Sequence, residues 1–142
     1  MALGGYVSKK KTGVRRISDS RLSRLWSHAV KVKYGRCPIT GQTDGLQSHH
    51  IIPKGRQNRF CIRWNIRNGV PLSDAAHRML HDGDIDVQKK LIEYVEDRGD
   101  KDYLMEIKNM LKHEFLQHIG MCESEYRKML LDELKQIIVE YS

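Results

Sequence analysis

Apolar residues recur every three or four positions along five stretches of the chain, which is the spacing of one face of an α-helix. The first helix begins at Ser18 or Asp19, either of which can cap it, and runs to about Val32 before Gly35. Its apolar face carries Leu22, Leu25, Trp26, Ala29 and Val30. The other predicted helices cover about residues 74–81 (capped by Ser73), 84–98, 101–118 and 124–139.

The segment between the first two helices has a different pattern. Residues 37–45, CPITGQTDG, have the composition of turns. Residues 46–53 are typical of a short strand that enters a turn at Pro53-Lys54-Gly55. Residues 54–68 form a basic loop, with a candidate second strand around Cys61–Trp64. The whole pattern predicts an α+β fold in which a small stranded unit is followed by helices.

The chain has 142 residues, of which 39% are hydrophobic and 30% charged, so we expect one domain with one core. Residues 1–17 are rich in glycine, lysine and arginine and are predicted to form a flexible basic arm. The single domain then spans residues 18–142. It divides into an N-terminal helix (18–35), a central unit (37–83) and a helical extension (84–142).

Positive charge is concentrated in the first half of the chain. Residues 1–72 carry 15 Lys and Arg against two acids, a balance of +13, whereas residues 73–142 carry 10 against 16, a balance of −6. A basic half beside an acidic half favours contact with a polyanion, although a solvated surface with a basic tail has the same composition.

The three cysteines, Cys37, Cys61 and Cys122, form no CxxC pair and no evident disulfide framework. No apolar stretch approaches the roughly 18 residues that a membrane span needs, and the N-terminus lacks the apolar core of a secretory signal. We therefore expect a cytoplasmic protein with no membrane partner, located in the host-cell cytoplasm if it is encoded by a phage.

Four of the seven histidines have spacings that suit one divalent metal ion. His77 and His81 are four residues apart, so on a helix they share a face, with Cβ atoms roughly 5–6 Å apart. His49 and His50 lie upstream and can supply a third ligand and a base. Three imidazole ligands leave coordination positions open for substrate, and a fourth histidine with a pKa near ~6.5 can deprotonate water. This chemistry suits hydrolysis of a phosphodiester.

These blocks, SHHIIP, Asn68-Gly-Val-Pro-Leu and the His77/His81 pair, resemble the motif of HNH nucleases. Asn68 follows His50 by 18 positions, His77 follows Asn68 by nine, and His81 follows His77 by four. The resemblance covers about residues 37–83. It implies a ββα-metal finger core within the α+β fold, and it is closest to the three-histidine version of colicin-type DNases. The IRWNIRN segment and the helical tail also resemble phage recombination nucleases of the HNH class.

The resemblance implies a role for each polar residue of the motif. His49, His77 and His81 match the metal ligands, and His50 matches the general base. Asn68 matches the residue that braces the loop and positions the base. Such an imidazole set implies one divalent ion, which can be Mg, Mn, Ni, Co or Zn.

Many HNH proteins also carry a structural zinc held by two CxxC pairs. Here the corresponding positions are Cys37, Thr40, Ser73 and Ala76, so three of the four thiolates are missing and no structural zinc site of four cysteines can form. We expect Cys37 to be a small buried apolar residue, with the helical extension supporting the finger instead.

Neighbouring side chains in a regular strand point to opposite faces. His49 and His50 can therefore act together only if the strand twists, bulges or ends there, and the turn at Pro53 favours an ending. If the strand stays regular, only one of the pair is functional.

The basic residues around the motif are candidate phosphate contacts, and ordinary solvated positions are the alternative for each. Trp64 is expected in the core rather than on a base. The candidate DNA contacts are Lys9, Lys10, Lys11, Arg15, Arg16, Lys54, Arg56, Arg59, Arg63 and Arg67.

The sequence thus favours a metal-dependent HNH endonuclease that acts on double-stranded or branched DNA, typical of a phage or mobile element. One metal and one base would nick one strand, so a monomer or a homodimer is expected. The alternatives are a non-catalytic DNA-binding finger protein and a toxin-like nuclease with an inhibitory partner, for which no secretion segment is visible.

Overall fold

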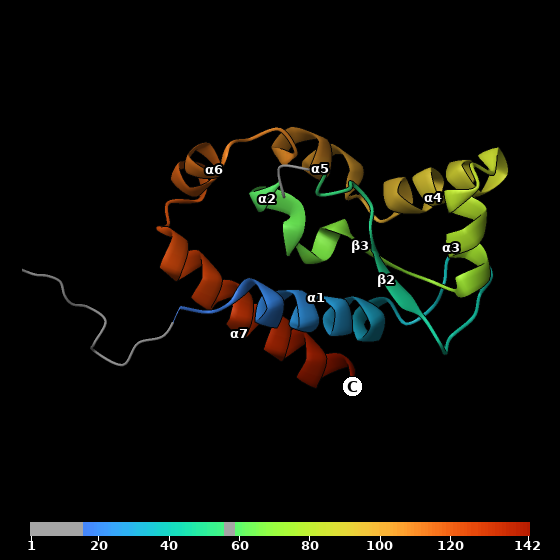
Figure 1. Cartoon of the computed structure of the whole chain (residues 1–142), viewed down its shortest axis with the longest axis horizontal. Helices are drawn as coiled ribbons and strands as arrows, with labels where there is room; N and C mark the ends of the chain where they lie inside the picture. The colour runs from blue at the N-terminus through green and yellow to red at the C-terminus, as the bar shows by residue number, and fades with distance from the viewer. Residues whose placement is uncertain (1–15, 56–58) are drawn as a thin grey trace, which may run out of the picture.

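The computed structural model describes residues 16–55 and 59–142. Within these residues lie seven α-helices, one short 3-10 helix and two antiparallel strands, so the predicted α+β class is confirmed. The long helices α1 (Asp19–Tyr34) and α7 (Glu123–Tyr141) pack against each other along one side of the molecule (Figure 1). Ser18 caps α1 as predicted, and Gly35 ends it in the left-handed conformation that glycine tolerates.

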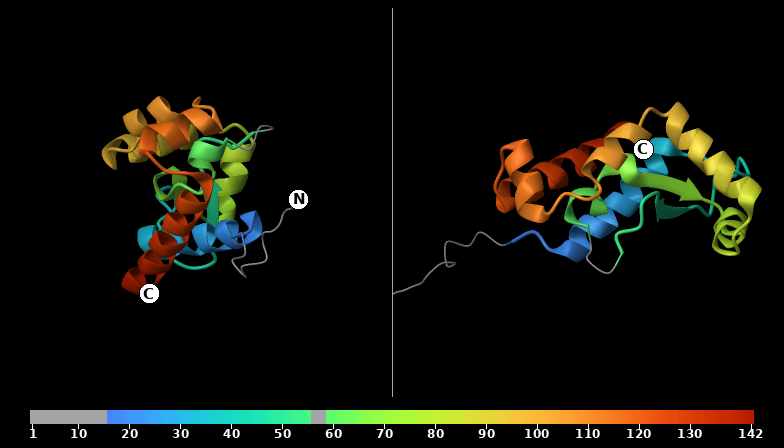
Figure 2. Two further views of the ribbon diagram at one scale, coloured as in Figure 1. Left: turned by 90° about the vertical axis from the view of Figure 1, so that its left-hand side faces the viewer. Right: turned by 90° about the horizontal axis from the view of Figure 1, so that it is seen from above.

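The opposite side of the molecule is formed by α5 (Lys101–Ile107) and α6 (Lys112–Ile119), which pack on the short helix α2 (Phe60–Arg63) (Figures 1 and 2). The prediction of one helix over residues 101–118 is therefore wrong. Its interruption is stabilised by one local and one long-range hydrogen bond. The Glu114 carboxylate accepts from the backbone N–H of Leu111, and the Cys61 thiol of α2 donates to the carbonyl of Ile107. The break lets both Ile107 and Phe115 reach the core.

The two strands are β2 (Gln47–His50) and β3 (Gly69–Leu72), with His49 opposite Val70 and His50 opposite Gly69. The candidate second strand at Cys61–Trp64 is wrong, because that segment forms α2 and is followed by the 3-10 helix η1 (Ile66–Asn68). The sequence pattern does not predict β3. All four of its residues are buried, so apolar and polar positions do not alternate, and Pro71 has no N–H to donate.

Gly69 lets β3 lie directly on α1. A Cβ atom at this position would overlap Cγ2 of Val30 and come within 3.2 Å of the ring of Trp26. No larger residue fits there without displacing the helix. The start of β3, opposite His50, is thus fixed against the middle of α1.

Helices α3 (Asp74–His81) and α4 (Ile85–Asp97) follow β3 and pack on each other. Ser73 and Asp84 cap them, as the sequence predicts. One apolar cluster joins Leu91 and Val95 of α4 to Val70, Leu72 and Ala76. The helical extension therefore covers the strand-containing unit, as expected.

The main core lies between α1, α2, α5, α6 and α7. It contains both tryptophans, and Trp64 is 1% exposed, so its predicted place in the core is confirmed. The indole N–H of Trp26 donates to the carbonyl of Asn65, and that of Trp64 donates to the hydroxyl of Ser23. These bonds satisfy the polar edge of each ring where it is buried.

Asp100 ties the junction of α4 and α5 to β3. Its carboxylate pairs with Arg98 at 2.8 Å and with Arg67 at 2.6 Å. The Arg98 guanidinium also donates to the carbonyl oxygens of Arg67 and Gly69. The start of β3 is therefore held by charge-assisted hydrogen bonds from the helical extension.

None of the helices in the described part of the chain is both long enough and apolar enough to cross a membrane.

Candidate functional site

The histidines expected to bind metal come from β2 and α3. The ring of His49 meets the ring of His77 edge-on, with centroids 5.5 Å apart. His81 lies one turn further along α3, with its ring centroid 6.4 Å from that of His77. His49 and His77 are half-buried and His81 is exposed. The fold thus brings together three residues that are up to 32 positions apart in the sequence.

The arrangement of the three rings is close to that of a ligand set but is not complete. Metal–nitrogen bonds of about 2.0–2.1 Å would place the centroids of two rings on one ion ~5 Å apart. The His49–His77 pair has nearly this separation, whereas His81 would have to move inward by ~1 Å. Accordingly, among residues 16–55 and 59–142, no group of three or more His, Cys, Asp or Glu has the geometry of a ready metal site.

The protonation of His49 favours a role as ligand. Burial lowers its pKa below the usual value, and the nearby His77 and His50 lower it further. A neutral imidazole has the lone pair that a metal ion requires.

His50 is held by two contacts on the other side of the strand. Its ring stacks on the indole of Trp26, with centroids 4.1 Å apart and planes 10° from parallel. Its Nε2 atom lies 2.9 Å from the carbonyl oxygen of Arg63. Because a carbonyl can only accept, Nε2 must carry the hydrogen when the ring is neutral, and Nδ1 then has the lone pair. This is the tautomer of a base that would act through Nδ1.

The environment of His50 also keeps its ring neutral. Burial lowers its pKa, and the charges of Lys54 and Arg63 lower it further, against the opposing effect of the Arg63 carbonyl. The ring therefore has a lone pair available at neutral pH.

His49 and His50 obey the alternation of a regular strand, since one contacts α3 and the other contacts α1. The strand ends at His50, as the turn at Pro53 predicts, but the two rings do not converge on one point. Because β2 ends at His50, which is one of the geometries that allow both histidines a role, each of the two roles has to be tested separately.

Asn68 is fully buried and uses its whole amide group. Its Oδ1 accepts from the backbone N–H of Ile52 at 2.8 Å, and its Nδ2 donates to the carbonyls of Ile52 at 3.0 Å and Ile62 at 3.3 Å. The backbone carbonyl of Asn68 also accepts from Ile51. Asn68 thus connects the segment after His50 to α2, whose last residue holds the His50 ring.

The four positions that would carry a structural zinc do meet in space. The hydroxyl of Thr40 donates to the hydroxyl of Ser73 at 3.0 Å, and the latter accepts from the N–H of Ala76 at 3.2 Å. Cys37 is fully buried in the apolar cluster with Val70 and Leu72, as expected, and polar groups of Thr40 and Ser73 also lie near its thiol. Burial raises the pKa of its thiol, yet the Thr40 hydroxyl and backbone N–H groups, including that of Ser73, lower it to about 7. Hydrogen bonds therefore join the 37–41 turn to the start of α3.

The candidate DNA contacts fall into three groups. Lys9, Lys10, Lys11, Arg15 and Arg56 lie outside the described residues. Lys54 is half-buried, Arg59 donates to the carbonyl of Pro53, and exposed Arg16 pairs with Glu123. Arg63 and Arg67 have structural partners, since Arg63 pairs with Asp19 and Arg67 pairs with Asp100 while stacking on Tyr103. Their availability to DNA stays a prediction.

The sequence does not indicate two sets of residues that contact the candidate base or the candidate DNA-binding arginines. Trp26 was assigned only to the apolar face of a helix, although it also supports His50. Lys108, Lys112 and Arg127 come from the acidic half of the chain but lie beside Arg59 and Arg63. No local signal indicates these neighbours, because their proximity depends on how the helices pack.

Comparisons with protein-family models, with curated proteins and with solved structures find no match to this chain. The motif and the geometry of these residues are therefore the basis for inferring a function.

Proposed function

We propose that the protein is a metal-dependent HNH endonuclease that nicks DNA. The observation that carries the proposal is the approach of His49 to His77, at 5.5 Å between ring centroids, with His50, whose tautomer is fixed, next to His49 in the sequence. In this proposal β2, β3 and α3 form the ββα-metal core. A single site of this kind cuts one strand per event, whether the protein is a monomer or a homodimer.

His49, His77 and His81 would hold one divalent ion through neutral imidazoles. When bound, the ion would neutralise the phosphoryl oxygens and stabilise the leaving oxygen. The contribution of the chain is to present two histidines at i and i+4 on α3 and one from the adjoining strand. Exposed His81 would have to approach the ring of His77 to complete the set.

His50 would act as the general base. Its Nδ1 lone pair takes a proton from the attacking water, while Nε2–H stays bonded to the carbonyl of Arg63. That carbonyl stabilises the imidazolium that forms, and Trp26 holds the plane of the ring. Asn68 would position the base by fixing Ile52, two residues after His50, and Ile62, next to the Arg63 carbonyl that holds the ring.

A second candidate function is DNA binding without cleavage. Two observations favour it. The side chains of His49 and His50 project from opposite faces of β2. Within the described residues, the three candidate ligands His49, His77 and His81 do not form a ready metal site. In this case the finger would have a structural role, and His50 would be a buried partner of Trp26.

Incubating supercoiled plasmid with the purified protein and Mg²⁺, Mn²⁺, Co²⁺, Ni²⁺ or Zn²⁺ tests the two candidates. We expect nicked circles, and His50→Ala should slow nicking by about 10²–10⁴-fold, the usual contribution of a general base. His28→Ala is a matched control, because His28 is an exposed histidine of α1 whose side chain takes part in none of the contacts described for the site.

Calorimetric titration with Ni²⁺ or Zn²⁺ separates the ligands from the base. His77→Ala should abolish tight binding, whereas His50→Ala should retain it. Cleavage by His50→Ala at the rate of the unmodified protein would refute the mechanism. DNA binding with no cleavage by any metal would favour the second candidate.

A further inference from the structure

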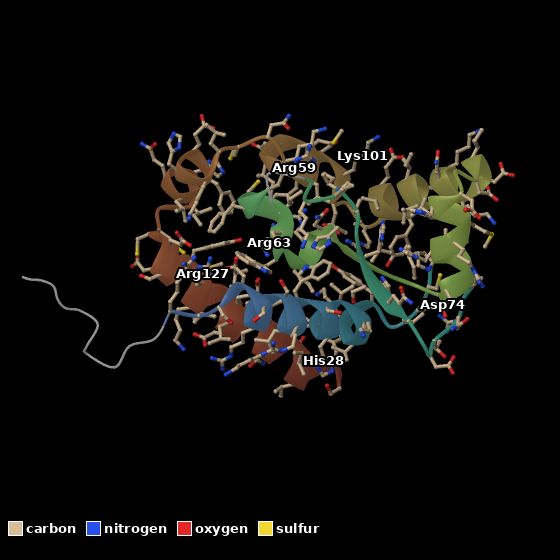
Figure 3. All side chains as sticks on the ribbon, in the orientation of Figure 1. His28, Arg59, Arg63, Asp74, Lys101 and Arg127 are labelled. Atoms are coloured by element: carbon tan, nitrogen blue, oxygen red, sulfur yellow. The ribbon has the colours of Figure 1, made fainter. Side chains whose placement is uncertain are left out.

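A pocket of about 370 Å³ lies between the start of α1, α2, the α5–α6 connection and α7. Six cationic side chains line it, and we call it the cationic pocket: Arg16, Arg59, Arg63, Lys108, Lys112 and Arg127. Three of them come from the basic half of the sequence and three from the acidic half. Figure 3 shows Arg59, Arg63 and Arg127 on one side of the molecule, apart from His28 and Asp74.

The carboxylates near these cations are too few to neutralise them. Asp19 bridges Arg63 at 3.1 Å and Arg127 at 2.8 Å. Glu123 pairs with Arg16, Lys112 and Arg127. The ion pairs of the described residues thus set two carboxylates against six cations.

The neighbouring cations lower the pKa values of both carboxylates. Burial raises the pKa of Asp19, but the hydrogen bond with Arg127 and the charges of Arg127, Arg63 and Arg16 bring it below its usual value. The hydrogen bond with Lys112 likewise lowers the pKa of Glu123. The pocket is therefore a region of positive potential.

Arg63 has a donor that the protein leaves unused. Its Nη1 binds Asp19, and its guanidinium lies 4.8 Å from the ring of Trp64, which Arg127 approaches at 5.0 Å. Its Nε–H is buried and has no hydrogen-bond partner among the described residues. A buried unpaired donor is unfavourable, so a shift of this side chain that let an anionic acceptor reach Nε would stabilise it.

We propose that the cationic pocket binds a backbone phosphate of the DNA strand that is cut at the candidate site. Arginine forks bind phosphate oxygens in a geometry that lysine alone does not supply, and lysines add charge. Arg63 connects the cationic pocket with the candidate site, because its backbone carbonyl holds His50 and its side chain lines the pocket. The inference rests on the proposed function for the identity of the polyanion as DNA.

Fluorescence anisotropy with a labelled single-stranded oligonucleotide and a labelled duplex, both in EDTA, tests the proposal without cleavage. The variant R59A/K108A removes two pocket cations that have no carboxylate partner among residues 16–55 and 59–142. Because the pocket is proposed to hold one phosphate, and a lost phosphate contact lowers the salt slope by about 0.7 for single strands and about 0.9 for duplex, the slope should fall by about these amounts. The charge-conserving variant R59K/K108R should bind nearly as the unmodified protein does.

The control K89A/K90A removes two lysines from exposed positions on α4, outside the pocket, and should leave the slope unchanged. An equal slope in R59A/K108A and the unmodified protein would overturn the proposal. Loss of DNA binding together with loss of nicking would support it, whereas failure of nicking with intact pocket-dependent binding would refute only the nuclease.

Nuclear magnetic resonance of the Arg63 Nε–H group provides a test that needs no variant. The signal should move on addition of the oligonucleotide. If inorganic phosphate or a deoxynucleoside monophosphate moves it and the oligonucleotide does not, the pocket is a small-anion site and the proposal fails.

Discussion

The Nε2 atom of His50 donates to the backbone carbonyl of Arg63 at 2.9 Å, so a candidate catalytic ring is positioned by the last residue of a four-residue helix. That helix is in turn attached to the strand segment by Asn68. The position of the base therefore depends on buried backbone contacts rather than on the strand alone.

Asn68→Ala should lower the free energy of unfolding by about 2–4 kcal/mol, because it leaves the polar groups of Ile52 and Ile62 buried without partners. Urea titration followed by circular dichroism measures this loss. Asn109→Ala changes an exposed asparagine and serves as the control. A loss below about 1 kcal/mol would show that water or rearrangement replaces the three hydrogen bonds.

Gly69→Ala should destabilise the protein by about 1–3 kcal/mol, since the added methyl overlaps Val30 in an already packed core. The double variant V30A/G69A should recover part of this loss relative to the sum of the single changes, because it removes the nearest atoms. The coupling energy follows from the free energies of unfolding of the unmodified protein, V30A, G69A and V30A/G69A. Strict additivity would contradict the contact between β3 and α1.

Stability should rise between about pH 7 and pH 9 because of Cys37. The pKa of this thiol is lowered to about 7 in the folded protein, so the unfolded chain binds more protons over this interval and folding gains up to about 2 kcal/mol. The gain is lost as pH falls through 7. Chemical denaturation at several pH values should show the rise, and Cys37→Ala should remove it. A rise of equal size in Cys37→Ala would assign the effect to another group.

The triple variant T40C/S73C/A76C should acquire a structural zinc site together with Cys37. The side chains at 40 and 73 already meet at 3.0 Å, and zinc needs four thiolates at about 2.3 Å. Without zinc the variant should lose about 1 kcal/mol, because Ser73 caps α3. With zinc at about 100 times its dissociation constant it should gain about 2.7 kcal/mol.

Cobalt substitution offers a direct check on that site, since four thiolates give an intense visible spectrum. The variant T40C/A76C, which keeps Ser73, is the matched control with three thiolates. An absent cobalt spectrum in the triple variant would mean that Cys37 and the other three positions do not converge on one ion.

Caps and periodicity predicted the helices well. Ser18, Ser73 and Asp84 each accept a hydrogen bond from the first turn of their helix, so local chemistry alone fixes where these helices begin. The stripe over residues 101–118 was misleading, because its apolar residues serve two helices that approach the core from different directions.

The short elements around the site were less predictable. Strand β3 contains Pro71 and shows no alternation, because both of its faces are covered. The metal-binding pattern could be seen because His77 and His81 share one helix. The contacts of His50 with Trp26 and Arg63 join segments 24 and 13 positions away, which only tertiary packing brings together.

The Asp100 junction makes the strand-containing unit inseparable from the helices that follow it. Arg98 holds the carbonyls of Arg67 and Gly69, and α4 covers the apolar side of β3. A segment cut after residue 83 would expose Val70 and Leu72 and free the start of β3. The finger is therefore not a portable module, and any transplant into another scaffold would have to carry the chain at least through Asp100.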